Sequence, residues 1–217
     1  MQMSVTEVVD DVYTVQFEHV RVFVLEGYPE GSVTLIDTGF PGDGDELVAV
    51  LNAEFGGVDR VLISHGDEGH FGGTPAVVDA FDPELAVPGG AKGFYDALEL
   101  NADHHFSDGD CLDGDIRVVQ VPGHTPANSG FLLEESNTFI AGDIVEGSDR
   151  RGLPAGYLVP PAAQFNDDSH AAAERNLAAL FEHDIDSILV SHGSHVHDNP
   201  LEKLDDWLID RAWTLEH

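Results

Sequence analysis

The chain places histidines and one aspartate where predicted strands end. His65, His124 and His192 each come at or just after the end of a predicted strand, and Asp143 has the same kind of position. Loops that follow strands often carry chemistry, because the sheet holds them rigidly while the loop exposes their side chains. Imidazole and carboxylate groups together are ligands for zinc or iron. The pattern therefore predicts a metal site built from strand-end loops that converge.

The elements that must position these residues alternate between short strands and helices. Hydrophobic periodicity and β-branched content predict strands over residues 12–16, 20–26, 33–36, 60–64, 85–87, 116–121, 129–133, 138–141 and 185–191. Apolar faces at helical spacing predict helices over residues 45–55, 74–81, 91–100, 170–183 and 201–213. A Pro- and Gly-rich stretch over 147–161 is expected to be a long loop. No linker divides the chain, so we expect a single domain over 1–214, with 215–217 resembling the start of an expression tag.

The charge of the chain is strongly negative. Its 217 residues include 41 Asp and Glu against 9 Lys and Arg, for a formal net charge of −32. The acids run through the whole sequence and form no tail, which is typical of the acidic coat of proteins from halophiles. Such a surface disfavours nucleic acid, whose phosphates need a basic face. The alternative, an acidic binder of a basic partner, fits evenly spread charge less well.

The chain has one cysteine and no long apolar run. Cys111 has no partner for an intrachain disulfide, which is expected of a reducing compartment, and we expect Cys111 to be a small core residue. No apolar run approaches the roughly 20 residues of a membrane span. The first ten residues lack the pattern of a signal peptide. We therefore expect a cytoplasmic protein without membrane contact.

Five short motifs, in this order, resemble those of the metallo-β-lactamase superfamily and its glyoxalase-II-like metallohydrolases. They are Asp37-Thr38-Gly39, His65-Gly66-Asp67-Glu68-Gly69-His70-Phe71-Gly72-Gly73, Pro122-Gly123-His124-Thr125-Pro126, Ala141-Gly142-Asp143 and Ser191-His192-Gly193. One motif alone would be weak, but five in order are specific. The resemblance implies an α+β/α/β fold: a four-layer αββα sandwich of two mixed β-sheets flanked by helices, with a metal site at one edge of the sheets.

The resemblance also implies a role for each matching residue. It assigns His65, Asp67 and His124 to a first metal ion. It assigns position 69, His70 and His192 to a second. Asp143 would bridge the two ions, and Asp37 would orient a ligand from behind.

The sequence departs from the family pattern at two of these positions. The family pattern His-x-His-x-Asp-His here becomes His65-x-Asp67-x-Gly69-His70. Asp67 is chemically tolerable, because a carboxylate binds zinc and suits iron or manganese even better. Gly69 is more serious, since it removes a ligand of the second ion. We therefore expect one or two zinc ions, with iron or manganese as alternatives, and Glu68 is a less well placed substitute for the missing carboxylate.

Residues of the long loop and of the last motif could contact a substrate. Arg150 and Arg151 are the only adjacent basic pair, and arginine binds carboxylates in bidentate fashion. The hypothesis is a pocket for an anionic small molecule, with Tyr157 and Phe165 packing against its apolar part. His195 could line the same cleft. The alternatives are a surface pair that balances local acids and an ordinary loop histidine.

The leading functional expectation is a metal-dependent hydrolase of a small ester, thioester or lactone. Metal-activated hydroxide would attack the carbonyl, with Asp67 and Asp143 as the catalytic carboxylates. One alternative is a mononuclear iron oxygenase resembling the persulfide dioxygenases. Others are a family member impaired by Gly69 and a metal-poor scaffold or regulatory protein. The sequence carries no signal for the oligomeric state.

Overall fold

The computed structural model describes residues 4–90, 101–113, 115–166 and 170–205. The chain divides into two compact units. Unit 1 is Met1–Ser107 with Cys111–Asp115, and unit 2 is Asp108–Asp110 with Ile116–His217. The single-domain expectation stays a prediction. The helix expected over 91–100 and the end of the one expected over 201–213 lie outside the described residues.

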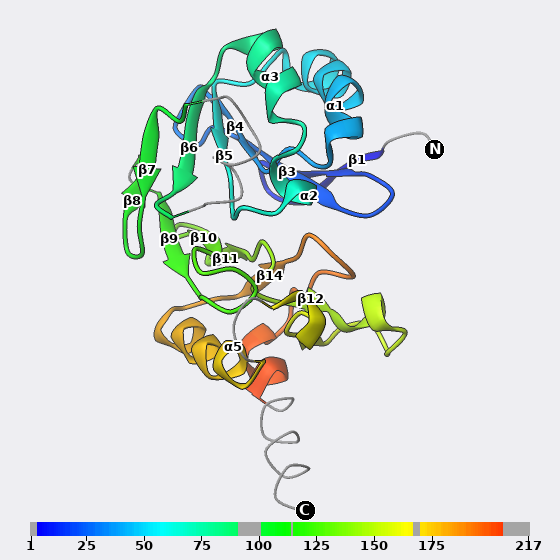
Figure 1. The fold of residues 1–217 in the computed structure, drawn as a ribbon, viewed down its shortest axis with the longest axis vertical. Helices are drawn as coiled ribbons and strands as arrows, with labels where there is room; N and C mark the ends of the chain where they lie inside the picture. Colours follow the sequence, from blue (N-terminus) through cyan, green and yellow to red (C-terminus); the bar gives the residue numbers. More distant parts are fainter. Residues whose placement is uncertain (1–3, 91–100, 114, 167–169, 206–217) are drawn as a thin grey trace, which may run out of the picture. The chain divides into compact units, whose positions relative to one another are not determined.

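Unit 1 is built on a mixed sheet whose seven strands follow the order of the chain (Figure 1). They are β1 (Ser4–Val9), β2 (Val12–Gln16), β3 (Arg21–Glu26), β4 (Val33–Ile36), β5 (Arg60–Leu62), β6 (Glu84–Pro88) and β7 (His104–Phe106). The first four strands pair antiparallel, and β4 to β7 pair parallel. Because β4 and β5 are parallel neighbours, the loops that follow them leave the same edge of the sheet.

Two helices of unit 1 pack together against one face of its sheet (Figure 1). They are α1 (Gly44–Val50), which continues as a π-helical turn over Leu51–Phe55, and α3 (Thr74–Phe81). Leu47 and Val77 are fully buried and join strand residues such as Val22 and Val61 in one core. The short helix α2 (Glu68–Phe71) lies within the motif that carries His70. The apolar spacing that predicted helices over 45–55 and 74–81 is therefore confirmed.

Unit 2 carries the second mixed sheet. Its strands run in the order β14 (Ser187–Leu189), β11 (Thr138–Ile140), β10 (Ser129–Leu133) and β9 (Ile116–Gln120). The pair β11 and β14 is parallel, and the others are antiparallel. Helix α5 (His170–Asn176) continues as a 3-10 helix over Leu177–Glu182, and Leu177 and Leu180 pack on this sheet. A small separate sheet pairs β12 (Glu146–Gly147) with β13 (Leu158–Val159) inside the predicted long loop.

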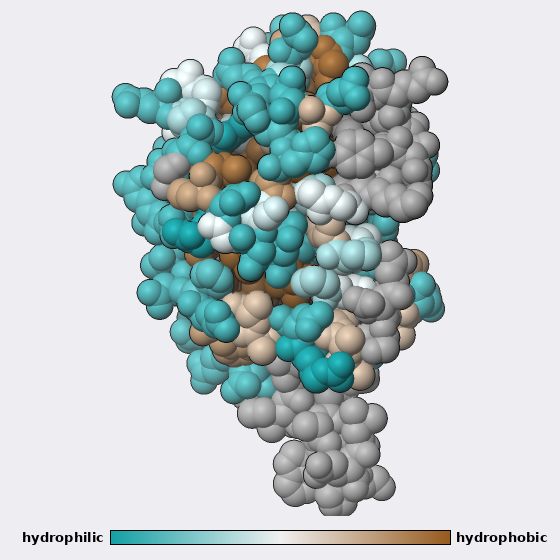
Figure 2. All heavy atoms as spheres, turned by 60° about the vertical axis from the view of Figure 1, so that its left-hand side comes forward, coloured by the Kyte–Doolittle hydropathy of each residue, from teal (hydrophilic) through white to brown (hydrophobic). Residues whose placement is uncertain are grey.

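Some expectations about single segments fail. Strands β1 and β7, the second of which contains His104 and His105, were not among the expected strands. The expectation that Cys111 is a core residue is wrong, because it lies exposed in the two-residue strand β8 (Cys111–Leu112). This strand sits within the acidic turn region 108–115, which has too few apolar neighbours in sequence to form a core. Among the described residues no helix combines the length and apolar character needed to cross a membrane. The face in Figure 2 is largely hydrophilic, in agreement with the acidic composition.

Candidate metal site

Unit 1 brings three of the predicted residues together in a buried cluster. Asp37 follows β4, His65 lies three residues after β5, and His70 lies in α2. Their side chains are almost fully buried, as is that of Ser64. Asp37 has a backbone φ of +62°, a left-handed conformation that aspartate tolerates better than most residues. Such a conformation is maintained only where surrounding contacts hold it, and it often marks a functional position.

A chain of hydrogen bonds determines which ring nitrogen of each histidine carries the proton. The Asp37 carboxylate accepts hydrogen bonds from the Ser64 amide at 2.8 Å and from the Ser64 hydroxyl at 2.7 Å. Its Oδ2 also lies 2.7 Å from Nδ1 of His70, so this nitrogen must donate. The single hydroxyl proton of Ser64 points at Asp37, so Ser64 Oγ accepts from Nδ1 of His65 at 2.9 Å. Both imidazoles therefore carry their lone pair on Nε2.

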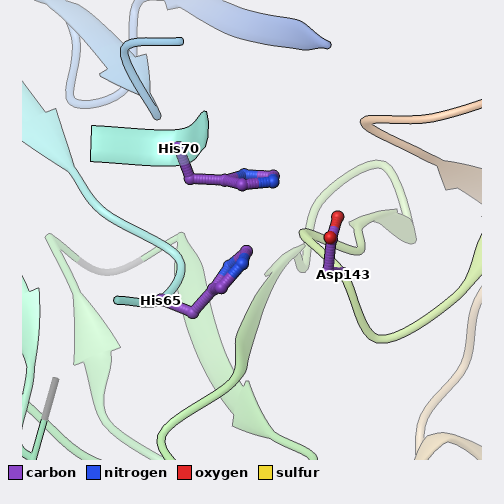
Figure 3. A group of neighbouring side chains, drawn as sticks. All are labelled: His65, His70 and Asp143. Atoms are coloured by element: carbon purple, nitrogen blue, oxygen red, sulfur yellow. The ribbon is translucent and has the colours of Figure 1, made fainter. Parts of the chain in front are cut away.

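The two imidazole rings of unit 1 lie beside each other (Figure 3). Their centroids are 4.1 Å apart and their planes are inclined by 47°. Two neutral imidazoles with lone pairs on Nε2, each held through Nδ1 by a hydrogen bond, are the form in which histidine binds a metal ion. The buried cluster of unit 1 therefore fits a metal.

The motif residues Asp67, Glu68 and Gly69 are not buried, unlike His65 and His70 on either side of them. Asp67 is exposed at the N-cap of α2, and its backbone carbonyl accepts the amide of His70 at 2.9 Å. Glu68, the possible substitute carboxylate, is also exposed, in the first turn of the same helix. Gly69 offers no side chain, and a Cβ placed there would lie 2.9 Å from Cζ of Phe40. The space beside Gly69 is thus already filled by an aromatic ring.

Close backbone packing fixes the loop of Asp37 against the segment that carries His70. The Thr38 amide donates to the carbonyl of His70 at 2.7 Å. A Cβ on Gly73 would lie 2.2 Å from the carbonyl oxygen of Thr38, and a Cβ on Gly72 would lie 2.3 Å from Cδ of Pro41. Only glycine permits this approach.

We expect Gly73→Ala to destabilise the protein by about 1–3 kcal/mol, because the new methyl group meets backbone that has no room to move. Gly42→Ala is the matched control, since a Cβ on Gly42 meets nothing within 4 Å and its φ is not left-handed. Urea unfolding monitored by circular dichroism measures both variants. Equal midpoints would contradict the packing described.

Unit 2 brings together the other three predicted ligands. The carboxylate of Asp143, which follows β11, lies between the imidazoles of His124 and His192. Its Oδ2 is 3.5 Å from Nε2 of His124, and its Oδ1 is 3.4 Å from Nε2 of His192. The two oxygens thus face different rings, as expected of a carboxylate that bridges two ions.

The backbone of Phe165 sets the proton position on His124. Nδ1 of His124 is hydrogen-bonded to the carbonyl oxygen of Phe165, so Nδ1 carries a proton. A neutral His124 would then aim the lone pair of Nε2 at a carboxylate oxygen, which is repulsive. The arrangement becomes favourable when imidazole and carboxylate share a cation, either a proton or a metal ion. The donor set of unit 2 therefore also fits a metal.

Contacts between two loops of unit 2 hold His192 in place. The Gly147 amide donates to the carbonyl of His192 at 2.8 Å. The Asp149 carboxylate accepts the Ser194 amide and the Ser194 hydroxyl, both at 2.8 Å. Asp149 and Ser194 thus join the loop after Asp143 to the loop that contains His192.

Of the residues predicted to contact substrate, some are exposed in unit 2 and others are held by contacts within it. Arg151 forms an ion pair with Glu146 at 2.6 Å and donates to the Pro160 carbonyl, which ties the long loop together. Arg150 is exposed, as are the side chains of Tyr157 and Phe165. His195 accepts the Val190 amide on Nδ1 at 3.0 Å, so its Nε2 carries the proton.

Several groups that position the proposed ligands were not predicted from the sequence. Ser64, Asp149, Ser194 and the carbonyl of Phe165 carry no motif of their own. The one available signal was the place of Ser64 directly before His65 and after a buried strand. A hydroxyl there can hydrogen-bond a neighbouring ring.

Comparisons with known proteins agree on one protein family. The model of the metallo-beta-lactamase superfamily matches residues 15–192. A lactamase-like protein of Aspergillus fumigatus is 32% identical over 118 residues, which are 52% of this chain and 34% of that protein. The hydroxyacylglutathione hydrolase of Anaeromyxobacter dehalogenans is 30% identical over 142 residues, 61% of this chain and 52% of that protein. The matches thus span a third to about half of the length of these curated relatives.

Solved structures show the same fold at low sequence identity. A metallo-beta-lactamase from Pontibacter korlensis has a TM-score of 0.71 and 18% identity, covering 96% of this chain and 100% of that one. One from Hirschia baltica has a TM-score of 0.72 and 14% identity, covering 96% and 97%. The expected class of two mixed sheets with flanking helices is confirmed. Because the family model covers most of the chain, through all the motifs with His65, His70, His124, Asp143 and His192, this protein belongs to the metallo-β-lactamase superfamily.

Proposed function

We propose that this protein is a metal-dependent hydrolase of a small ester, thioester or lactone. The observation that carries the proposal is the Asp143 carboxylate, whose two oxygens face the imidazoles of His124 and His192. The buried network of Asp37 supports it, because it presents two further imidazoles with lone pairs on Nε2. The family match through both units and the hydroxyacylglutathione hydrolases among its relatives give the reaction class.

The donors of the two units are proposed to hold divalent ions in the arrangement that the family implies. His65, Asp67 and His124 would bind the first ion, His70 and His192 the second, and Asp143 both. Three donors, two imidazoles and a carboxylate, are a sufficient set for a catalytic zinc ion. Because Gly69 supplies no donor, we expect the second ion to be bound more weakly than the first. Zinc is the proposed metal, and the exposed carboxylate of Asp67 also suits iron or manganese.

A bound divalent ion supplies hydroxide at neutral pH by lowering the pKa of its water to about 7. The remaining tasks fall to the residues of the chain. Asp37 and Ser64 keep His65 and His70 in one tautomer, and the carbonyl of Phe165 does the same for His124. Asp67, exposed at the start of α2, is proposed to accept the proton that the attacking water loses when it becomes hydroxide. An exposed carboxylate gives this proton to solvent readily.

The substrate is proposed to be a small molecule with an anionic group. Arg151 is engaged by Glu146 and Pro160 within the long loop, so Arg150 is the better of the two arginines for this group. Tyr157 in this loop and Phe165 just after it have exposed side chains, which are proposed to contact the apolar part of the substrate. His195, a donor through Nε2, is proposed to lie beside them.

Metal content and hydrolysis measured on one preparation test this function. Protein purified without chelator in high salt should contain between one and two equivalents of zinc or a similar ion by elemental analysis. It should hydrolyse an ester, an S-acyl thioester or a lactone, lose that activity after dialysis against a chelator, and regain it with added zinc. Metal-loaded protein without activity on any of the three classes would overturn the hydrolase. One iron per chain with oxygen uptake on a persulfide would favour the oxygenase instead.

A further inference from the structure

Phe40 is a large apolar side chain that stays exposed in unit 1 although its loop is held firmly. It lies on the loop between β4 and α1, and 39% of its surface is accessible. The Phe40 amide donates to the Asp43 carboxylate at 2.9 Å, and the Phe40 carbonyl accepts the Asp43 amide at 2.9 Å. The preceding Gly39 has a φ of +73°, which turns the chain into this loop. The Phe40 ring therefore projects from a turn that two hydrogen bonds between Phe40 and Asp43 close.

The Phe40 ring rests on the glycine that departs from the family pattern. A Cβ on Gly69 would lie 2.9 Å from Cζ, 3.2 Å from Cε1 and 3.3 Å from Cε2 of Phe40. The whole outer edge of the ring thus covers the backbone at position 69. The neighbouring Pro41 packs on Gly72 in the same way, within 2.4 Å of where a Cβ would stand. Two glycines therefore make room for two consecutive side chains of one loop.

The ring lies next to a proposed metal ligand. Gly69 directly precedes His70, and the Thr38 amide, two residues before Phe40, donates to the His70 carbonyl. On another side the His19 ring meets Phe40 edge to face, with centroids 6.5 Å apart and planes inclined by 83°. Phe40 thus forms a partly exposed apolar surface beside the histidine pair of unit 1.

We propose that Phe40 is a specificity-determining residue whose ring receives the hydrophobic acyl group of the substrate beside His70. The inference rests on the proposed hydrolase and names its substrate class: esters or thioesters with an apolar acyl chain. An aromatic ring that is already held in place binds an apolar group without losing further side-chain freedom. Gly69 is then the residue that permits the ring to occupy this position.

An acyl-chain series tests the role of Phe40. The probes are the p-nitrophenyl esters of acetic, butyric and hexanoic acid, assayed with zinc-loaded protein of measured metal content. In wild type we expect kcat/KM to rise with chain length. In Phe40→Ala we expect the hexanoate-to-acetate ratio of kcat/KM to fall about 10-fold, mainly through a higher KM for the hexanoate ester. Phe40→Leu should restore most of the ratio, because it keeps an apolar side chain of similar reach.

Two further variants separate this role from a structural one. Phe181→Ala, which removes a similarly exposed phenylalanine (42%) from unit 2, should leave the ratio unchanged. Gly69→Ala should lower the ratio as Phe40→Ala does, since its methyl group displaces the ring. An unchanged ratio in Phe40→Ala with wild-type metal content would overturn the inference and leave the hydrolase intact. A wild-type protein that carries metal but cleaves none of the three esters, nor a thioester or lactone, would remove both.

Discussion

Asp143→Ala should abolish most metal binding and lower kcat/KM by more than about 100-fold. A residue that only supports a ligand typically costs 10–100-fold when it is removed, and Asp143 is proposed to be a ligand itself. In its absence His124 and His192 would have no shared carboxylate. Metal bound per chain, from elemental analysis after gel filtration, and hydrolysis of an ester, thioester or lactone that the wild-type protein cleaves give the two readouts.

The control for Asp143→Ala is Asp79→Ala. Asp79 is exposed on α3, and Asp79→Ala changes charge and side-chain size by the same amount as Asp143→Ala. It should keep metal content and turnover unchanged. Circular dichroism shows whether each variant folds. Full turnover in a folded Asp143→Ala variant would remove the proposed metal centre and the mechanism with it.

Asp37→Ala should destabilise the protein and weaken its metal binding at the same time. The substitution leaves three buried donors without their acceptor: the Ser64 amide, the Ser64 hydroxyl and Nδ1 of His70. Each buried donor left unsatisfied costs about 1–3 kcal/mol, so we expect a loss of about 3 kcal/mol or more. Alanine also tolerates the left-handed φ of +62° less well than aspartate. Urea unfolding of the metal-free protein measures the loss.

Asp37→Asn separates the two effects. Asparagine keeps the shape and accepts the left-handed backbone, so the loss of stability should be smaller. Its amide group, however, presents a donor where the carboxylate accepted from Ser64 or His70, which favours the other tautomer of a histidine. We therefore expect metal affinity, measured by competition with a chelating dye, to fall about 10–100-fold. Asp45→Asn, exposed in the first turn of α1, is the control. Wild-type affinity in Asp37→Asn would show that the tautomers do not depend on Asp37.

The proposed ligands and most of the elements that carry them could be predicted from the amino-acid sequence. His65, His124, Asp143 and His192 follow strands whose alternation or β-branched content is visible locally, and the structure places each after such a strand. Strands over 12–16, 33–36 and 129–133 and the helix over 74–81 have the predicted bounds. These features were predictable because side-chain periodicity and motif spacing depend on neighbours along the chain.

The tautomers of the histidines and the surroundings of Gly69 depend on contacts between distant parts of the chain and became visible in the fold. Asp37 reaches His70 across 33 residues, and the Phe165 carbonyl reaches His124 across 41. The ring of Phe40, 29 residues earlier in the sequence, packs on Gly69. The glycine that removes a ligand of the family pattern thus also makes room for an aromatic side chain. Such contacts join residues that are far apart in the sequence. The type of one residue does not indicate which distant residue it will contact. For this reason the ligands could be predicted from the sequence, while the groups that orient them required the fold.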